Sequence, residues 1–160
     1  MNNPIQYLLF DWGDTLMVDY PQCTGAMVTW PRVTPMEGVH SLMPKLSENY
    51  TCAVLSNAGD SDAALMKKAF EKAELEPYFQ WFFTSKELGA SKPNPMFFEQ
   101  ALQKLNASAG EAMMIGNDYE KDIVPARAVG MNTVLISKAA GNYLDADHVL
   151  DDFSALSFLL

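Results

Sequence analysis

The sequence predicts an α/β fold in which helices cover both faces of a mostly parallel central sheet. Short apolar runs rich in strand-forming residues alternate along the chain with segments whose apolar residues recur at helical spacing. Such alternation is typical of parallel strands joined by crossover helices. Two of the runs, 7–10 and 112–115, are continuous apolar runs, as expected for strands that are buried on both faces.

Six runs are expected to be strands, and four helical patterns lie among them. The runs are Tyr7–Phe10, 51–55, Trp81–Thr84, 112–115, 133–136 and, more weakly, His148–Leu150. The helical patterns cover 39–46, 66–73, 98–105 and 122–129, with a start signal at 60–62, a cap at 94–95 and a stop at Gly130. Pro44 should bend or shorten the first helix.

Three further segments carry minor predictions. Segment 17–35 contains several prolines and no clean periodicity, so we expect a loop or a short flap over one end of the sheet. The aromatic run 81–83 is expected to be a buried strand. Four acidic residues near the C-terminus are expected to form a solvated face: Asp145, Asp147, Asp151 and Asp152.

Length, composition and charge narrow the class of protein. With 160 residues, 49% of them apolar, residues 1–160 are expected to form a single domain. The formal charge of −9 disfavours a nucleic-acid or membrane-surface partner. Two cysteines are too few for a disulfide framework or a zinc site. Neither a leader-like N-terminal stretch nor a membrane-spanning run is evident, so the expected location is the cytoplasm.

Polar residues follow several predicted strands, where ligands bind in an open parallel sheet. These candidates are Asp11, Gly13 and Asp14 after the first strand, Ser56 and Asn57 after the second, Asn117, Asp118 and Asp122 after the fourth, and Lys92 in a nearby loop. Carboxylate and amide oxygens suit Mg²⁺, which typically keeps waters and binds substrate phosphate. A hydroxyl and a lysine suit phosphoryl oxygens, and a carboxylate beside them can act as a nucleophile.

Four segments resemble the motifs of the haloacid dehalogenase (HAD) superfamily and occur in that family's order. Residues 8–16, Leu-Leu-Phe-Asp-Trp-Gly-Asp-Thr-Leu, resemble a strand followed by Asp-x-Asp-x-Thr. Residues 54–57 resemble a strand that ends in Ser or Thr. Residues 89–95 contain the lysine followed by proline, and 115–123 with 128–131 resemble Gly-Asp-x-x-x-x-Asp-Ile leading to Ala-Gly-Met.

The resemblance implies a Rossmann-like three-layer sandwich and a Mg²⁺-dependent phosphohydrolase that works through an aspartyl-phosphate. It implies that Asp11 is the nucleophile and a metal ligand, and that the backbone carbonyl of Gly13 is a second ligand. Ser56, with Asn57 beside it, would bind phosphoryl oxygens, and Lys92 would steady Asp11 and the phosphate. The remaining metal ligands would come from Asn117, Asp118 and Asp122, and the choice among these three stays open.

The first motif departs from the family pattern at its second acidic position. Gly13 stands where the family has an Asp that serves as general acid/base, and Asp14 comes one residue later. Because side chains alternate along an extended segment, Asp14 points elsewhere unless the backbone turns. Asp14 is either a replacement acid or a plain loop carboxylate. Since losing a positioned proton donor costs about 10²–10⁴-fold in rate, the alternative function is a catalytically weak or inactive binding or regulatory protein.

Many relatives carry a helical cap between the first two motifs, and segment 17–35 is too short for one. We therefore expect no cap domain and an open site, which favours a large phosphorylated substrate or closure by a partner subunit in an oligomer. A dehalogenase would use the same nucleophile without Mg²⁺, but its small substrate normally needs a cap. A receiver-type signalling domain is less favoured, since its acceptor Asp follows a later strand.

Overall fold

A computed structural model describes residues 4–160, which contain one six-stranded sheet. The strand order is β3-β2-β1-β4-β5-β6, and every neighbouring pair is parallel. The strands are β1 (Tyr7–Phe10), β2 (Thr51–Ser56), β3 (Trp81–Thr84), β4 (Ala112–Gly116), β5 (Asn132–Ile136) and β6 (His148–Leu150). The predicted α/β fold with a parallel sheet is confirmed, and the first strand lies inside the sheet.

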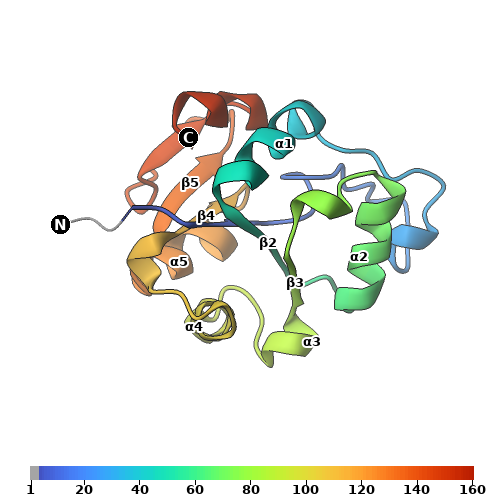
Figure 1. Cartoon of the computed structure of the whole chain (residues 1–160), viewed down its shortest axis with the longest axis horizontal. Coiled ribbons are helices and arrows are strands. Elements are labelled where there is room, and N and C mark those ends of the chain that lie inside the picture. The colour runs from blue at the N-terminus through green and yellow to red at the C-terminus, as the bar shows by residue number, and fades with distance from the viewer. Residues whose placement is uncertain (1–3) are drawn as a thin grey trace.

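Helices cover both faces of this sheet, as Figure 1 shows. α1 and α2 lie on one side, and α3, α4 and α5 lie on the other. The helices are α1 (Val39–Asn49), α2 (Ala63–Lys72), α3 (Ser85–Leu88), α4 (Pro95–Leu105) and α5 (Val124–Ala128). Shorter turns are the 3₁₀ helices η1 (Met27–Thr29), η2 (Glu76–Tyr78), η3 (Ala109–Glu111) and η5 (Phe153–Phe158), and the π-helical turn η4 (Tyr119–Ile123).

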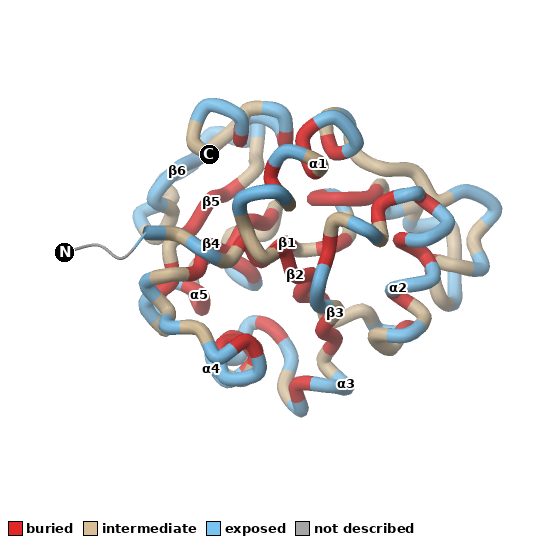
Figure 2. Tube along the Cα trace, in the orientation of Figure 1, coloured by how far each residue is buried: buried red, intermediate tan, exposed pale blue. Residues whose placement is uncertain are grey.

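β1 joins the two apolar layers of the molecule. Successive side chains of a strand point to opposite faces, so Leu8 and Phe10 pack under α1 and α2 while Leu9 packs against α4. All three side chains are fully buried, and the buried strands form the centre of Figure 2. Burial on both faces explains why this run contains no polar residue, and it fixes the place where the strand ends at Asp11.

Sequence signals set the helix boundaries in two of the three longest helices. The Asp62 carboxylate accepts the Leu65 N–H at 2.9 Å, and α2 begins at the next residue after Asp62. Asn94 caps α4 in the same way, with Pro95 as the first helical residue. Pro44 does not end α1, which continues to Asn49. The buried face of this helix packs on the sheet on both sides of the proline, and that packing outweighs the lost hydrogen bond.

Segment 17–35 forms an extended loop with one short 3₁₀ helix, η1. Its two ends meet, because Met17 and Pro35 form an antiparallel bridge and the Val18 N–H donates to the Thr34 carbonyl at 2.8 Å. Lys72 of α2 holds its far end by donating to the Trp30 carbonyl at 2.9 Å. We call this segment the flap.

Two sequence-based interpretations hold only in part. β3 is an edge strand, and Trp81 is 42% exposed while it stacks on Phe83. Within residues 4–160, no strand pairs with the outer flank of β3, so this apolar run is not buried along its whole length. Part of the C-terminal acidic group is structural rather than merely solvated. Asp147 accepts the Thr133 N–H of β5 at 2.9 Å and pairs with Arg127 at 2.7 Å.

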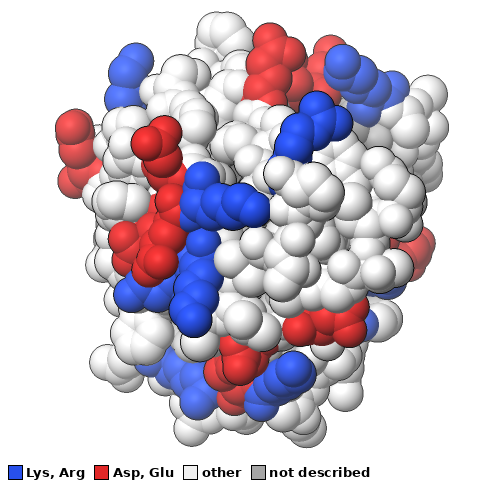
Figure 3. Space-filling model, turned by 90° about the vertical axis from the view of Figure 1, so that its right-hand side faces the viewer, with Lys and Arg blue, Asp and Glu red and all other residues white. Residues whose placement is uncertain are grey.

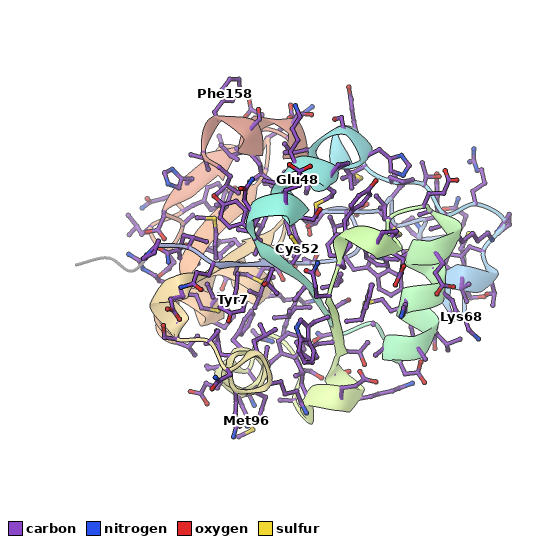
Figure 4. The ribbon with its side chains drawn as sticks, in the orientation of Figure 1. Tyr7, Glu48, Cys52, Lys68, Met96 and Phe158 are labelled. Atoms are coloured by element: carbon purple, nitrogen blue, oxygen red, sulfur yellow. The ribbon has the colours of Figure 1, made fainter. Side chains whose placement is uncertain are left out.

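Two further features bear on the class of protein. Cys52 is buried in β2 (Figure 4), and burial raises the pKa of its thiol to about 12, so this cysteine is inert near neutral pH. Within residues 4–160, no helix has both the length and the apolar character needed to cross a membrane.

Candidate active site

Lys92 and two carboxylates form the centre of the candidate site, at the carboxyl end of β1. Lys92 Nζ donates to Asp11 Oδ1 at 2.9 Å and to Asp122 Oδ1 at 2.7 Å. The Lys92 and Asp122 side chains are almost fully buried, whereas that of Asp11 remains 15% exposed. The chain therefore brings together residues that are 81 and 30 positions apart, and Asp11 is the most exposed of the three.

The charges around them shift the pKa values of Lys92 and Asp122. Burial alone lowers the pKa of Lys92, but the negative charges of Asp11 and Asp122 outweigh it, so the pKa is raised and the ammonium persists. Burial and the Asp11 charge raise the pKa of Asp122 to about 6, although Lys92 acts in the opposite direction. An ammonium has three donors, and two are used here, so one remains for a phosphoryl oxygen.

Asp122 reaches the site because the end of β4 has no side chain to block it. A Cβ atom placed on Gly116 would lie 2.6 Å from Asp122 Cβ, a distance that such atoms do not adopt. Asp122 Oδ2 also accepts the Asp118 N–H at 3.1 Å. Both oxygens of Asp122 thus have protein partners, which favours a supporting position behind Lys92.

Asn57 fixes the backbone on which Lys92 sits. Its Oδ1 accepts the Lys92 N–H at 2.7 Å, and its Nδ2 donates to the Lys92 carbonyl at 3.1 Å. Both ends of the Asn57 amide are occupied, so its side chain positions Lys92 and is not free for a ligand. Phosphate binding by Asn57 stays a prediction, and it now rests on the backbone of this residue alone.

The second oxygen of Asp11, Oδ2, lies near the Asn117 amide and the Thr15 hydroxyl, and the Gly13 carbonyl lies close to the same amide. In one amide orientation, Asn117 Oδ1 accepts from the buried Thr15 hydroxyl at 3.2 Å. In the other, its Nδ2 lies 2.9 Å from Asp11 Oδ2 and 3.3 Å from the Gly13 carbonyl oxygen. The Thr15 hydroxyl also lies 3.4 Å from Asp11 Oδ2. One carboxylate, one carbonyl and one amide therefore converge within a few ångströms.

This donor set fits Mg²⁺. Across residues 4–160, no cluster of three or more His, Cys, Asp or Glu side chains is spaced to hold a metal ion. A Mg²⁺ ion typically takes only one or two carboxylates and completes its shell with neutral oxygens, waters and substrate phosphate. Asp11 Oδ2, the Gly13 carbonyl and the Asn117 amide oxygen match that pattern. The Asp118 side chain instead caps η4 by accepting the Lys121 N–H at 3.0 Å.

The remaining predicted residues lie around the same opening. Ser56 ends β2 and accepts the Ala58 N–H at 3.2 Å through its hydroxyl oxygen, which leaves the hydroxyl proton for a ligand. Asp14 is exposed, has a φ of 58°, and accepts the Asp19 N–H at 2.9 Å. The turn predicted as necessary for Asp14 does occur, and it directs this carboxylate to the flap backbone. Proton transfer by Asp14 stays a prediction.

Two adjoining hollows open at this end of the sheet. The first, of about 270 Å³, contains Asp11, Lys92 and Asn117 among its lining residues. The second, of about 290 Å³, lies beside it under the flap and is lined partly by Trp12, Met27 and Trp30. Gly13, Asp19 and Ser56 line both hollows. Figure 3 views the molecule from the side toward which β1 runs, where acidic and basic side chains lie next to one another in small groups.

Sequence reasoning missed two residues of this region. Thr15 is 1% exposed and contacts both Asp11 and Asn117, and its place inside the first motif was the available signal. Asp19 lies in the flap, where no periodicity or motif marks it. Only the folded path of the flap brings its carboxylate to the boundary between the hollows.

The match to a protein family agrees with this arrangement. Residues 12–136 match the model of the haloacid dehalogenase-like hydrolases, which covers well over half of the chain and begins immediately after Asp11. The chain belongs to the haloacid dehalogenase-like hydrolase family. The superfamily resemblance carried by the four motifs is thereby confirmed, and so is the α/β architecture.

Curated relatives of this HAD-like chain carry the names of phosphatases and a nucleotidase. A ribulose-1,5-bisphosphate 5-phosphatase of Halopiger xanaduensis is 35% identical over 101 residues, which cover 56% of this chain and 42% of the relative. A glyceraldehyde 3-phosphate phosphatase of Methanocaldococcus jannaschii is 38% identical over 80 residues, or 50% of this chain and 33% of the relative. The pyrimidine 5'-nucleotidase YjjG of Escherichia coli is 30% identical and covers 62% and 44%. This chain spans less than half the length of these three relatives.

Solved structures show the same fold. An uncharacterized protein from Listeria monocytogenes serotype 4b superposes with a TM-score of 0.84 at 21% identity, covering 97% of this chain and 96% of that one. A putative HAD-hydrolase, YfnB from Bacillus subtilis, described as bound to magnesium, gives a TM-score of 0.79 at 14% identity and covers 99% of each chain. At these identities the likeness establishes the fold alone.

Proposed function

We propose that this protein is a Mg²⁺-dependent phosphohydrolase that works through an aspartyl-phosphate on Asp11. The observation that carries the proposal is the Asp11 carboxylate itself. One of its oxygens is held by Lys92 Nζ at 2.9 Å, and the other lies 2.9 Å from the Asn117 amide, which in turn lies 3.3 Å from the Gly13 carbonyl oxygen. A partly exposed carboxylate in such surroundings is poised to attack a phosphorus atom.

The residues of this chain have distinct tasks in the proposed reaction. Asp11 attacks the phosphorus of a phosphate monoester, the ester P–O bond breaks, and the acyl phosphate forms. Lys92 holds the Asp11 carboxylate and offsets the charge of the phosphoryl oxygens, and Asp122 and Asn57 hold Lys92 in place. The Ser56 hydroxyl donates to a phosphoryl oxygen. Water then cleaves the acyl phosphate and regenerates Asp11.

Asp11, the Gly13 carbonyl and Asn117 would hold the Mg²⁺ ion. A bound Mg²⁺ ion supplies positive charge that offsets the phosphoryl oxygens during transfer. Asp118 and Asp122 would support this group from behind, since hydrogen bonds with backbone N–H groups and Lys92 already engage their carboxylates.

The proposed substrate is a phosphorylated small molecule. The printed names of the relatives refer to sugar phosphates and a pyrimidine nucleotide. The hollow beside Asp11 has room for a leaving group of that size under the flap. These observations favour a metabolite over the phosphoprotein that an open site alone would suggest.

The test is hydrolysis of 4-nitrophenyl phosphate and of a panel of sugar and nucleoside phosphates. We expect turnover with Mg²⁺, none with excess EDTA, and none in Asp11→Asn, because the amide is not a nucleophile. Glu48→Gln is the matched control, since Glu48 is an exposed acid on α1 away from both hollows (Figure 4). Turnover that persists in Asp11→Asn, or its absence from the unmodified protein over the whole panel, would refute the proposal.

A further inference from the structure

We propose that Asp19 of the flap is the general acid/base of this site and takes the place of the side chain that Gly13 lacks. The inference rests on the proposed phosphohydrolase function and names the group that moves the proton. The Asp19 carboxylate, six residues further along the chain, would then transfer the proton that an Asp side chain at position 13 transfers in the family pattern.

The direction of the absent Gly13 side chain identifies Asp19. An ideal Cβ atom on Gly13 would lie 3.5 Å from Asp19 Cβ, 3.8 Å from its Cγ and 3.9 Å from its Oδ2. These are ordinary van der Waals contacts, and all the nearest atoms belong to Asp19. The Asp19 carboxylate therefore occupies the space into which a side chain at position 13 would extend.

The two hollows place Asp19 where a leaving group would depart. Asp19 is shared by the hollow that contains Asp11 and Lys92 and by the hollow under the flap. A monoester whose phosphoryl group lies beside Asp11 and whose organic part lies under the flap has its bridging oxygen at this boundary. A general acid must lie within hydrogen-bond reach of that oxygen.

Backbone contacts hold Asp19 in place, and no hydrogen bond from the rest of residues 4–160 engages its carboxylate. The Asp19 N–H donates to Asp14 Oδ1 at 2.9 Å, and the Asp14 N–H donates to the Met17 carbonyl at 2.6 Å. The neighbouring Val18 N–H donates to the Thr34 carbonyl across the flap. Asp14 is thus a positioning residue: its carboxylate holds the Asp19 backbone, and Asp19 transfers the proton.

The proton balance is complete without any other reactant. As Asp11 attacks phosphorus, the ester P–O bond breaks with its electron pair on the leaving oxygen, and the Asp19 carboxyl gives that oxygen its proton. The product alcohol departs. The Asp19 carboxylate then accepts a proton from water as the water oxygen attacks the acyl phosphate. The P–O bond to Asp11 breaks, phosphate leaves, and Asp19 is protonated again.

The test compares kcat/KM for an alkyl phosphate and for 2,4-dinitrophenyl phosphate. A poor alkoxide leaving group needs the proton, whereas dinitrophenolate leaves without it. We expect Asp19→Asn to lower kcat/KM by about 10²–10⁴-fold for the alkyl phosphate and far less for the dinitrophenyl ester. Glu37→Gln, an exposed acid just beyond the flap, should leave both values unchanged.

A second carboxylate should rescue the first. In the double variant Gly13→Asp with Asp19→Ala, alkyl phosphate turnover should return, because the truncation vacates the space beyond the Gly13 Cβ position and the backbone φ of Gly13 is ordinary for a side chain. Asp14→Asn keeps an oxygen that accepts the Asp19 N–H and should stay active, whereas Asp14→Ala should lose part of the alkyl turnover.

Each other outcome has a definite meaning. The assignment is overturned if Asp19→Asn loses the same factor of kcat/KM on both substrates and Gly13→Asp does not restore it. It is also overturned if Asp19→Asn loses no activity. In both cases the proposed function stands. A collapse of alkyl turnover in Asp14→Asn would assign the acid to Asp14 and overturn this assignment likewise. If the unmodified protein hydrolyses neither ester and is therefore as inactive as Asp11→Asn, the proposed function and this assignment are both overturned.

Discussion

Lys92 is a buried cation whose two partners are acidic, so its removal leaves charge without compensation. We expect Lys92→Met to lower the free energy of unfolding by about 3–5 kcal/mol at pH 8, because breaking a buried pair from one side strands its partner. Chemical denaturation checks this value. Lys67→Met is the matched control, since its exposed pair with Glu76 at 3.4 Å is worth roughly 0–1 kcal/mol.

The same variant should acquire a distinctive pH dependence. A carboxyl whose pKa is raised by folding stabilises the protein while protonated, and that contribution is lost as the pH rises through its folded pKa. The pKa of Asp122 is raised to about 6, with Lys92 holding it down, so Lys92→Met should raise it further. The stability lost in Lys92→Met should therefore be smaller at pH 5 than at pH 8. A loss that is equal at both pH values would show that the carboxylates are not responsible.

At the scale of elements, β4 and η4 meet through Gly116. Gly116→Ala would place a methyl group 2.6 Å from Asp122 Cβ and push η4 away from the strand. We expect a stability loss of about 1–3 kcal/mol and a roughly 10²-fold fall in kcat, since Asp122 would no longer hold Lys92. Thermal unfolding and phosphatase assays measure both. Gly110→Ala, where a Cβ meets nothing within 4 Å, should be neutral, and a neutral Gly116→Ala would contradict the argument.

The elements also show how far sequence reasoning reaches. Apolar runs predict the strands because burial on both faces leaves no room for polar residues, and parallel strands bring their carboxyl ends together. Asp11, Ser56 and Asn117 are found in this way. The path of the flap is different, because Met27 and the Lys72 contacts to its carbonyls fix it through tertiary packing. Asp19 acquires its position from that path, so no local pattern reveals it.

Hydrogen-bond partners are likewise outside the reach of local pattern. A Ser-Asn pair after a strand suggests phosphate contacts for both residues. The Asn57 amide instead holds the Lys92 backbone, 35 positions away, and this pairing depends on how the loop after α3 packs. Residue type and strand position locate the site, whereas the division of its residues into those that bind a ligand and those that support them requires the fold.

For the whole molecule, ligand binding and folding are linked through Asp11. The chain carries a formal charge of −9, and two of its carboxylates share one lysine, so added cation and phosphoryl mimic should stabilise the folded state. At about 100 times its Kd, a ligand specific for the folded state contributes about 2.7 kcal/mol. For a domain of this size that corresponds to a Tm increase of about 5–10 °C.

Differential scanning calorimetry with Mg²⁺ and beryllium fluoride should show this increase, and each alone should give less. An acidic protein also gains some stability from general charge screening, so matched NaCl and the Glu48→Gln variant serve as controls. Asp11→Asn removes the carboxylate on which the beryllium adduct would form, so its Tm should stay near its own ligand-free value. An equal increase in Asp11→Asn would place the linkage elsewhere on the acidic surface and remove Asp11 from the centre of the site.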